Sequence, residues 1–583
     1  MIAGAAPGFS GGGSANGRRA ACHAAGREFF MKKLSLLLAA ILCLTAFAGL
    51  SALAENNDDM VVVATQFGQI RGDQVSDDLI IYKGVPYAAP PVGELRWKAP
   101  IDPEPWEGVL DCTEFNPMGM QVMDMECWWA EDLWYPWLDE YPNMSEDSLY
   151  LQIYSPAKSA ADNLPVFVWI HGGASQHGVT YDAQAAAEEL AARGIIVVEV
   201  EYRMGLFGFY TSDELDAESE TGTSGNYGLM DNIKALEWIQ DNITAFGGDP
   251  TRVVIGGQSA GCSMVTYLMS SPLLTDDLWS GAVMCSTFRP FGTLKTQEQA
   301  KETGEKYLDF MGVGDYTLEE LRELPATFFC NEETDVNDYE VGWGSCLDGY
   351  VLTMDPVDFY TQPNAINGKN LLFGSCSGEG NASFTIQETE AIFEAAKETY
   401  GELYDKYDFE YIYRTTDDIA ATMEDLRLDS QLNAIAGMLN GAYLKALNPD
   451  SDFYCFFFSH WTPGREAELR WAWHSADLWY WFDSMRDVPE QRDWTELDYQ
   501  IGDWCSTYWA NFTATGDPNG DTVPVWNATT VEAPCFNDLG DEFVMRDSFY
   551  EGSHQLEGRD GLMLDHTIIS NGYDGMFDDM IGK

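Results

Sequence analysis

The sequence predicts an α/β protein with a large, mostly parallel central sheet and helices on both faces. Continuous apolar runs of strand length alternate with helical segments through the first half of the chain. Because these runs are apolar throughout, each strand is expected to be covered on both sides. The chain has 583 residues, 45% of them hydrophobic, and shows no internal repeat and no Pro/Ser-rich linker within 60–545. One large domain is therefore the simplest organisation.

The expected elements follow from local sequence patterns. Strands are predicted where apolar, β-branched or aromatic residues run together, at 164–170, 194–200, 252–255, 370–374 and 453–458. Helices are predicted where Ala/Glu-rich sequence or apolar residues at helical spacing occur, at 185–193 and 232–242. The longer, more polar and mainly helical stretches are expected to be insertions over the sheet, at 289–345 and 385–450.

Residues 31–54 have the three parts of a secretory signal. A positive start is followed by an apolar run and an Ala-x-Ala-like end at Ala52–Ala54. Residues 1–30 are Gly/Ala-rich and are expected to be an over-extended, disordered N-terminus. The mature chain 55–583 is then a secreted single domain with a polar tail from about 551. No later segment is apolar over the length that spans a bilayer, so no membrane anchor is expected after cleavage.

The net charge is −62, from 32 Lys and Arg against 94 Asp and Glu. This balance leaves no basic surface for phosphates, so no nucleic-acid partner is expected. A solvated acidic surface suits a secreted protein that must stay soluble. Of the twelve cysteines, Cys22 and Cys43 lie in the leader, which leaves ten in the mature chain. An exported chain can form disulfide bonds between them, but the sequence does not show which cysteines are bonded to each other. No metal-ligand spacing occurs, so no metal or organic cofactor is expected, and the sequence does not encode a readable oligomeric state.

A Gly-x-Ser-x-Gly pentapeptide at 257–261 follows the β-branched run Val253–Ile255 and precedes helix-compatible sequence. This is the sequence form of a nucleophile elbow, a tight strand-to-helix turn that exposes a serine Oγ. Gly257 and Gly261 leave room for strand and helix to approach each other around Ser259. The pentapeptide alone is common in loops, so attack by Ser259 on a carbonyl requires partners elsewhere in the chain.

A histidine must take the serine proton, and a carboxylate must orient that histidine. His474 lies near the C-terminus, as the order serine, acid, histidine requires, and His460 fits the same order. Glu379 follows the predicted strand 370–374, at the carboxyl end where active-site residues of parallel sheets gather. Glu379 is therefore the candidate acid, and both histidines are open as the base.

The developing oxyanion also needs backbone N–H donors. His171–Ala174 follows a central predicted strand and matches the Gly-rich oxyanion turn of esterases. Its amides, together with that of Ala260 directly after the serine, form the candidate oxyanion site.

These segments resemble the type-B carboxylesterase family, the cholinesterase and carboxylesterase lineage of the α/β-hydrolase fold. The resemblance extends over nearly the whole mature chain and rests on motifs in family order, at 83–97, 146–151, 225–231, 242–250, 253–262, 348–349, 378–380, 474–478 and 509–518. It implies Ser259 as nucleophile, Glu379 as triad acid and His474, rather than His460, as base. It further implies helical insertions over the active site and three oxyanion N–H donors, those of Gly173, Ala174 and Ala260.

Two departures from the family pattern concern the loops around the site. Ser148 stands where the family usually has a cysteine, whose bridge partner would lie near Gly119, so that disulfide is absent. Cys112 and Cys127 are a candidate replacement pair. Ser175 stands where a Phe often follows the oxyanion turn, and this smaller polar residue would widen or wet the pocket.

A third departure is Gln258, which stands where the family often has Glu. A missing carboxylate beside the nucleophile disfavours a cationic choline ester. Trp473 and Trp479 flank the candidate base and complete the candidate pocket with Ser175 and Gln258, although core packing is the alternative for both tryptophans. The expected activity is hydrolysis of a small-molecule carboxylic ester through an acyl-enzyme. Amide or lactone hydrolysis by the same triad, and a non-catalytic adhesion or binding protein of the same fold, are the alternatives.

Overall fold

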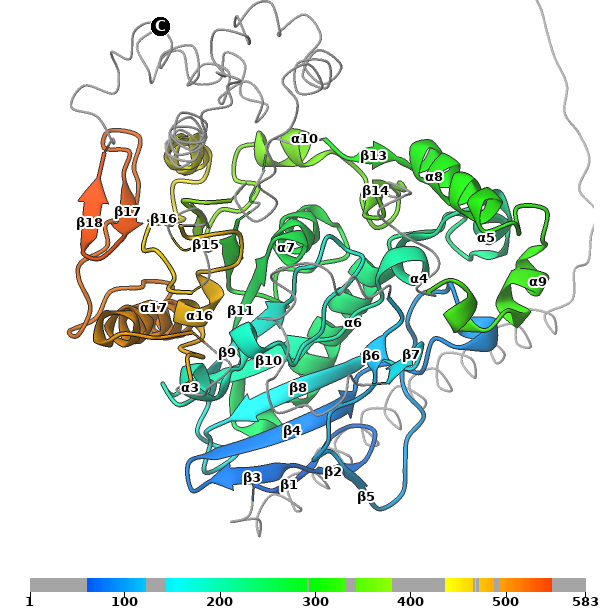
Figure 1. The fold of residues 1–583 in the computed structure, drawn as a ribbon, viewed down its shortest axis with the longest axis horizontal. Helices are drawn as coiled ribbons and strands as arrows, with labels where there is room; N and C mark the ends of the chain where they lie inside the picture. Colours follow the sequence, from blue (N-terminus) through cyan, green and yellow to red (C-terminus); the bar gives the residue numbers. More distant parts are fainter. Residues whose placement is uncertain are drawn as a thin grey trace, which may run out of the picture. The chain divides into compact units, whose positions relative to one another are not determined.

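An eleven-stranded sheet organises the described part of the chain (Figure 1). Neighbouring strands are parallel from β10 to β17, and the outer pairs are antiparallel. This computed structural model describes residues 60–121, 143–286, 288, 290, 293–330, 342–379, 436–464, 467, 471–486 and 492–547. In spatial order the strands are β18 (Phe543–Arg546), β17 (Phe536–Leu539), β16 (Phe453–Phe458), β15 (Asn370–Cys376), β12 (Gly281–Cys285), β11 (Gly248–Gln258), β9 (Leu164–Ile170), β10 (Ile196–Val200), β8 (Tyr150–Ser155), β4 (Leu79–Pro86) and β3 (Asp73–Ser76).

Smaller sheets and the helices complete the described structure. The smaller sheets join β1 (Val62–Ala64), β2 (Gln69–Arg71) and β5 (Val109–Asp111); β6 (Met118–Gly119) and β7 (Met144–Ser145); and β13 (Lys295–Thr296) and β14 (Cys346–Leu347). The α-helices are α3 (Glu188–Ala191), α4 (Gly205–Phe209), α5 (Asp213–Glu218), α6 (Tyr227–Asn242), α7 (Ala260–Ser270), α8 (Gln297–Phe310), α9 (Leu318–Glu323), α10 (Pro356–Tyr360), α16 (Leu478–Trp481), α17 (Glu496–Thr515) and residues 436–447. Short 3-10 turns are η1 (Gly93–Leu95), η2 (Ala183–Ala185), η3 (Ile243–Phe246) and η4 (Ala326–Phe328).

The predicted strands agree closely with the observed ones. The predictions 164–170 and 453–458 coincide with β9 and β16, and the other three fall within or largely overlap observed strands. The helix predicted at 232–242 ends correctly but begins five residues late, because Asn226 enters the left-handed region (φ 54°) and α6 starts directly after it. The predicted insertion at 289–345 contains α8 and α9, whereas residues 380–435 of the second insertion lie outside the described part.

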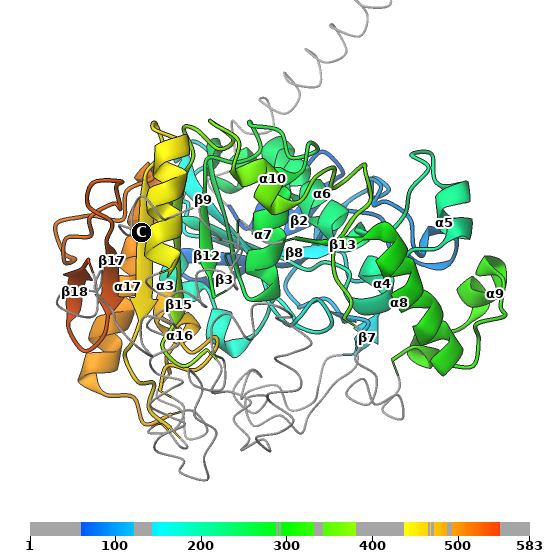
Figure 2. The same cartoon turned by 90° about the horizontal axis from the view of Figure 1, so that it is seen from above.

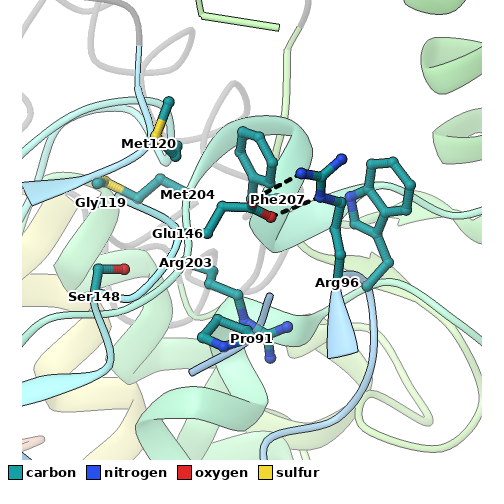
Figure 3. A pocket seen from close by; sticks show the side chains of 10 residues that line it. Pro91, Arg96, Gly119, Met120, Glu146, Ser148, Arg203, Met204 and Phe207 are labelled. Atoms are coloured by element: carbon teal, nitrogen blue, oxygen red, sulfur yellow. Dashed lines mark hydrogen bonds and ion pairs between the residues drawn. The ribbon is translucent and has the colours of Figure 1, made fainter. Parts of the chain in front are cut away.

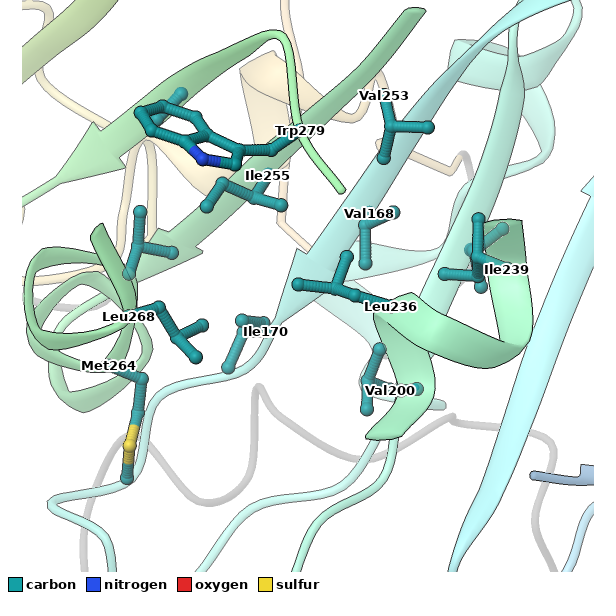
Figure 4. Packing of buried hydrophobic residues seen from close by; sticks show 14 of the residues in the cluster. Val168, Ile170, Val200, Leu236, Ile239, Val253, Ile255, Met264, Leu268 and Trp279 are labelled. Carbon is teal, nitrogen blue, oxygen red and sulfur yellow. The ribbon is translucent and has the colours of Figure 1, made fainter. Parts of the chain in front are cut away.

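Helices cover both faces of the sheet (Figures 1 and 2). An apolar core lies on each face. Along β9, Val168 and Ile170 face the core that α6 and α7 cover, and Figure 4 shows Leu236 and Leu268 of those helices in it. Phe167 and Trp169 of β9 face the core that α3, α16 and α17 cover. Because both faces are covered, the strands carry uninterrupted apolar sequence, as predicted. None of the helices among the described residues combines the length and hydropathy that a bilayer crossing requires.

Glu199 interrupts this apolar pattern in the middle of β10. Its side chain is fully buried. Burial first, and then the charge of Glu188, raise the pKa of Glu199 well above its ordinary value, while the Tyr154 hydroxyl opposes the rise only in part. The carboxyl group is therefore held in its neutral form over a wide range of pH. A raised carboxyl pKa costs stability above the pKa of the unfolded chain, about 4.3, because only the folded state then retains the proton.

Replacement of Glu199 by Gln is expected to stabilise the protein at alkaline pH. The free energy of unfolding should rise by about 1–3 kcal/mol near pH 8, and the difference should vanish near pH 4, where both states are protonated. Denaturant unfolding of the wild type and Glu199→Gln at several pH values measures this difference in the free energy of unfolding. The control is Glu189→Gln on exposed α3 surface, which should change little. An equal gain at pH 4 and pH 8 would show that the ionisation of Glu199 is not the cause.

Candidate active site

Ser259 occupies the turn between β11 and α7 in a strained conformation. Its φ of 55° and ψ of −123° are rare for a residue with a side chain. The turn needs glycine at two positions, because a Cβ on Gly261 would overlap the carbonyl oxygen of Ile170 and one on Gly257 would overlap the Gly261 backbone. The Ser259 N–H donates to the Cys285 carbonyl at 3.0 Å, which ties the turn to β12. This geometry is that of a nucleophile elbow.

Glu379 lies in the loop directly after β15. The Cys376 N–H donates to Glu379 Oε1 at 2.7 Å, and Oε2 contacts His474 Nδ1. The loop of His474 is joined to this segment, since the Gly378 N–H donates to the Ala472 carbonyl at 2.7 Å and Gly378 bridges to Trp473. Sequence-distant strands thus bring the predicted acid and base together.

His474 also reaches the elbow. Its Nε2 lies 3.2 Å from Nε2 of Gln258, the residue directly before Ser259. The ring therefore has one nitrogen at the carboxylate of Glu379 and the other at the end of β11. Nδ1 therefore faces the acid, and Nε2 faces the residue that precedes Ser259.

A second carboxylate, Asp477, lies behind this pair and was not singled out from the sequence. It is fully buried, and Trp481 Nε1 donates to its Oδ2 at 3.1 Å. Burial, with repulsion from Glu379, raises the pKa of Asp477 to about 6. Burial lowers the pKa of His474, but Glu379 and the charge of Asp477 outweigh it, so the net direction is upward. The sequence signal was available, because Asp477 is only three residues from His474, in the turn that leads into α16.

The oxyanion turn lies beside the serine. Gly173, Ala174 and Ser175 have consecutive positive φ values of 100°, 53° and 61°. A Cβ on Gly172 would lie only 3.1 Å from the Cβ of Ser259, so no side chain separates the turn from the elbow. Within the described residues, no hydrogen bond occupies the N–H groups of Gly173, Ala174 or Ala260. Such unoccupied backbone N–H groups are the kind of donor that an oxyanion site uses.

The remaining candidate pocket residues separate into two groups. The Ser175 carbonyl accepts the Gly205 N–H at 2.7 Å, which ties the oxyanion turn to α4, and Trp473 flanks the acid–base pair. Trp479 instead lies in the apolar core, 1% exposed, with its ring centroid 5.5 Å from that of Trp494. This position favours the core-packing role for Trp479, which the sequence offered as the alternative to a place in the substrate pocket.

A small hollow lined by Arg96, Met204 and Phe207, among other residues, contains none of the candidate pocket residues (Figure 3). Arg96 and Glu146 form a two-point ion pair in its wall, with both N···O distances 2.6 Å. Gly119 and Ser148 also line it and are neighbours, because a Cβ on Gly119 would lie 3.6 Å from Ser148 Oγ. The two positions implied for a family disulfide are thus adjacent without a covalent link.

The described cysteines are all free thiols, and most are buried. Cys112 is among them, while Cys127 lies outside the described residues, so the candidate pair Cys112–Cys127 is not tested. Among the residues that the structure describes, no three His, Cys, Asp or Glu side chains gather in a way that could hold a metal ion.

His460, the rival base, has both ring nitrogens engaged elsewhere. Its Nδ1 lies 2.8 Å from Asp541 Oδ1 and its Nε2 lies 2.9 Å from Asp498 Oδ1, which also accepts the Tyr480 hydroxyl at 2.7 Å. Burial lowers the pKa of His460, but the two carboxylates outweigh it and the net shift is upward. Although burial opposes it, the hydrogen bonds of His460 and Thr495 lower the pKa of Asp498 to about 2. His460 therefore links β16, α17 and the β17–β18 turn through its two ion pairs with Asp498 and Asp541.

Substitution of His460 by Gln is expected to destabilise the protein by about 1–3 kcal/mol at pH 6, because Asp498 loses its cation. A raised histidine pKa contributes stability below the unfolded value, about 6.5, and this stability is lost as pH rises through the folded value. The effect of His460→Gln should therefore shrink on going to pH 9. Chemical denaturation at pH 6 and pH 9 measures it. The control Asp541→Asn removes an exposed partner and should cost under about 1 kcal/mol. A loss of stability in His460→Gln that is the same at both pH values would contradict a stabilising role for the ion pairs of His460.

The sheet order, the elbow and the acid–base pair at the carboxyl ends of the parallel strands define an α/β-hydrolase. The sequence model of the carboxylesterase family matches residues 59–556. The chain belongs to this family, and its members' chemistry makes it a carboxylic ester hydrolase acting on small-molecule esters.

Two relatives illustrate the similarity in sequence. The chain is 31% identical to the fumonisin B1 esterase of Sphingopyxis macrogoltabida over 487 residues, which are 81% of this chain and 85% of the relative. It is 30% identical to the para-nitrobenzyl esterase of Bacillus subtilis (strain 168) over 492 residues, 81% of this chain and 94% of the relative.

Solved structures agree with this placement. A para-nitrobenzyl esterase structure superposes with a TM-score of 0.70 at 27% identity and covers 83% of this chain and 96% of its own. A carboxylesterase of Geobacillus stearothermophilus superposes with a TM-score of 0.69 at 29% identity, covering 83% and 97%. The predicted family and fold class are both confirmed.

Proposed function

We propose that the chain hydrolyses carboxylic esters with a Ser259–Glu379–His474 triad. The observation that carries the proposal is the imidazole of His474, which has Nδ1 at Glu379 and Nε2 at the residue before Ser259. In this arrangement Nε2 takes the proton from Ser259 Oγ as that oxygen attacks the ester carbonyl. Glu379 orients the ring and stabilises the imidazolium.

The reaction then passes through an acyl-enzyme. The tetrahedral oxyanion is held by the N–H groups of Gly173, Ala174 and Ala260. The alcohol leaves with the proton from His474, and a water molecule, deprotonated by the same histidine, releases the acid. The neutral Gln258 beside the serine lacks the charge that would favour a cationic choline ester, so neutral esters are the proposed substrate class.

Pre-steady-state hydrolysis of p-nitrophenyl acetate tests the proposal. A burst of p-nitrophenol equal to the enzyme concentration, followed by steady turnover, is the expected result because acylation precedes hydrolysis of the acyl-enzyme. Matched aryl amide and lactone substrates should turn over more slowly. Preference for either would favour the amidase or lactonase alternative, and the absence of any turnover would favour a non-catalytic binding protein.

We further propose that residues 31–54 direct export and that the mature protein begins near Glu55. The support is the tripartite signal pattern ending at Ala52–Ala54. N-terminal sequencing of protein recovered outside the producing cells is expected to begin at or near Glu55. Retention of residues 31–54 on protein held within the cells would contradict export.

A further inference from the structure

The carboxyl group of Glu201 joins two segments that border the candidate active site. Glu201 follows directly after β10, and its side chain is fully buried. The Thr180 N–H donates to Oε2 at 3.0 Å, and the Gly119 N–H donates to Oε1 at 3.4 Å. Each oxygen of one carboxyl group therefore accepts a backbone N–H from a different part of the chain.

The segment of Thr180 leads back to the oxyanion turn. It contains Gly178, where a Cβ would overlap the imidazole of His171 and lie 2.8 Å from the Gly172 carbonyl oxygen, so its backbone packs directly against the turn. Gln121 joins Gly178 to the other segment, because the Gly178 N–H donates to Gln121 Oε1 at 2.9 Å and Gln121 Nε2 donates to the Gly178 carbonyl at 3.0 Å. A displacement of either segment would therefore reach the N–H donors of the oxyanion turn.

These contacts lie beside the position of the absent family disulfide. A Cβ on Gly119 would lie 3.6 Å from Ser148 Oγ and 3.7 Å from Glu201 Oε1. The carboxyl group of Glu201 is thus next to the gap that a disulfide between positions 119 and 148 would close. Its hydrogen bonds hold the same segment that the disulfide would hold.

The ionised form of Glu201 is the form that can hold both segments. A carboxylate accepts hydrogen bonds on both oxygens, whereas a carboxylic acid carries an O–H on one of them and accepts poorly there. Burial raises the pKa of Glu201 to about 7, although the hydrogen bonds of Thr180 and Gly119 oppose the rise. Protonation below neutral pH would therefore leave one of the two N–H groups without a strong acceptor.

The surroundings of Glu201 carry little net charge near neutral pH. Arg203, the nearest cation along the chain, is paired with Asp231 at an N···O distance of 2.7 Å. The other titratable side chains that face Glu201 are neutral there, because burial raises the pKa of each: Glu199, Tyr87, Tyr181 and Tyr202. A change in the charge of this region near neutral pH is therefore a change in Glu201 itself.

We propose that Glu201 is a positioning residue, whose ionised carboxylate fixes the segment 118–121 against the loop after the oxyanion turn and so holds the turn beside Ser259. The proposal rests on the proposed triad and adds how its oxyanion site is supported. It also assigns a substitute for the disulfide that is absent at positions 119 and 148. Protonation of Glu201 loosens the turn and slows the reaction without removing the triad.

The kinetics of Glu201→Gln at two pH values test this role, with p-nitrophenyl acetate as substrate and the full chain. The carboxamide offers one acceptor oxygen for two N–H groups and cannot ionise, so it imitates the protonated form of Glu201. At pH 9 we expect kcat to fall about 10-fold with KM nearly unchanged, because the oxyanion forms only in the transition state. Near pH 5 the difference from wild type should vanish, because Glu201 is then protonated and the protonation of His474 affects both proteins equally. The control Glu199→Gln, two residues earlier, should match the wild type in kcat and KM at both pH values.

An engineered disulfide should rescue the variant. The pair Gly119→Cys and Ser148→Cys places two thiols within reach of each other, and a Cβ on Gly119 has only ordinary contacts with its neighbours. After oxidation with glutathione disulfide, Glu201→Gln in this background should lower kcat at pH 9 by less than about 2-fold, because the covalent link holds the segment. Reduction with dithiothreitol should restore the full loss.

Hydrogen exchange gives a readout that does not depend on turnover. In the wild type, protection of the Thr180 amide, corrected for the intrinsic exchange rate, should rise about 10-fold between pH 5 and pH 9 and should stay level in Glu201→Gln. A loss of kcat in Glu201→Gln that is equal at both pH values, a change confined to KM, or level protection in the wild type would overturn the proposal. If the wild type does not hydrolyse esters but its protection rises with pH, the proposed triad fails and the support by Glu201 stands. If the wild type is active and neither difference appears, the role of Glu201 alone fails.

Discussion

Replacement of Ser259 by Ala is expected to lower kcat/KM for p-nitrophenyl acetate by about 10⁴-fold or more while the fold is retained. The change removes the attacking Oγ, so the covalent route through an acyl-enzyme is lost. Residual hydrolysis would come from the oxyanion N–H groups and substrate binding alone. The strained backbone at φ 55° is equally accessible to alanine, so stability should change little.

The control for this variant is Ser263→Ala, one turn further along α7. The Ser263 N–H donates to the Ser259 carbonyl at 3.0 Å, and Ser263→Ala keeps this N–H. Its replacement should leave turnover near the wild-type value. Steady-state kinetics and thermal unfolding of both variants give the comparison. Comparable turnover by Ser259→Ala and wild type would remove Ser259 from the mechanism.

Gly261→Ala is expected to damage both stability and activity. A Cβ at this position would overlap the Ile170 carbonyl oxygen and lie 2.7 Å from that of His171, so α7 must move away from the end of β9. Because these are backbone atoms at the end of β9, the cost cannot be relieved by a rotamer change, and about 3 kcal/mol of destabilisation is expected. The same movement separates Ser259 from the oxyanion turn, so kcat should fall by about 10³-fold.

A matched glycine provides the control. Gly437 lies in the helix at 436–447, and a Cβ there would meet no atom within 4 Å. Gly437→Ala should therefore raise stability by about 0.5–1 kcal/mol, through the helix propensity of alanine, and leave activity unchanged. Denaturant unfolding and kcat for the two variants measure the contrast. Wild-type kcat and stability in Gly261→Ala would show that the elbow does not require the close approach of α7 and β9.

The parts of the fold that could be predicted were those determined by one continuous stretch of sequence. Strands buried on both faces require apolar residues at every position. The ends of the apolar runs 164–170 and 453–458 therefore predicted the ends of β9 and β16. The start of α6 was missed because Asn226 turns the chain in the left-handed region, which asparagine tolerates without an obvious sequence signal. Propensity and periodicity do not report such local turns.

Site residues were predictable in so far as motif and chain order describe them. Ser259, Glu379 and the oxyanion turn each follow a predicted strand, so the topology of a parallel sheet brings them to one edge. His474 could be separated from His460 only by family resemblance, since the ion pairs of His460 with Asp498 and Asp541 join distant segments. The contact of Gln258 with His474 spans 216 residues, and no local pattern encodes it.

Labelling with a fluorophosphonate, followed by peptide mapping, tests the proposed triad most directly. This probe reacts only with a serine whose Oγ is activated by a nearby base. We expect one adduct per chain, on Ser259, in the wild-type protein, and almost none in His474→Gln under the same conditions. An adduct on a different serine in a protein that hydrolyses esters, or labelling of Ser259 that is equally fast in His474→Gln, would contradict the triad.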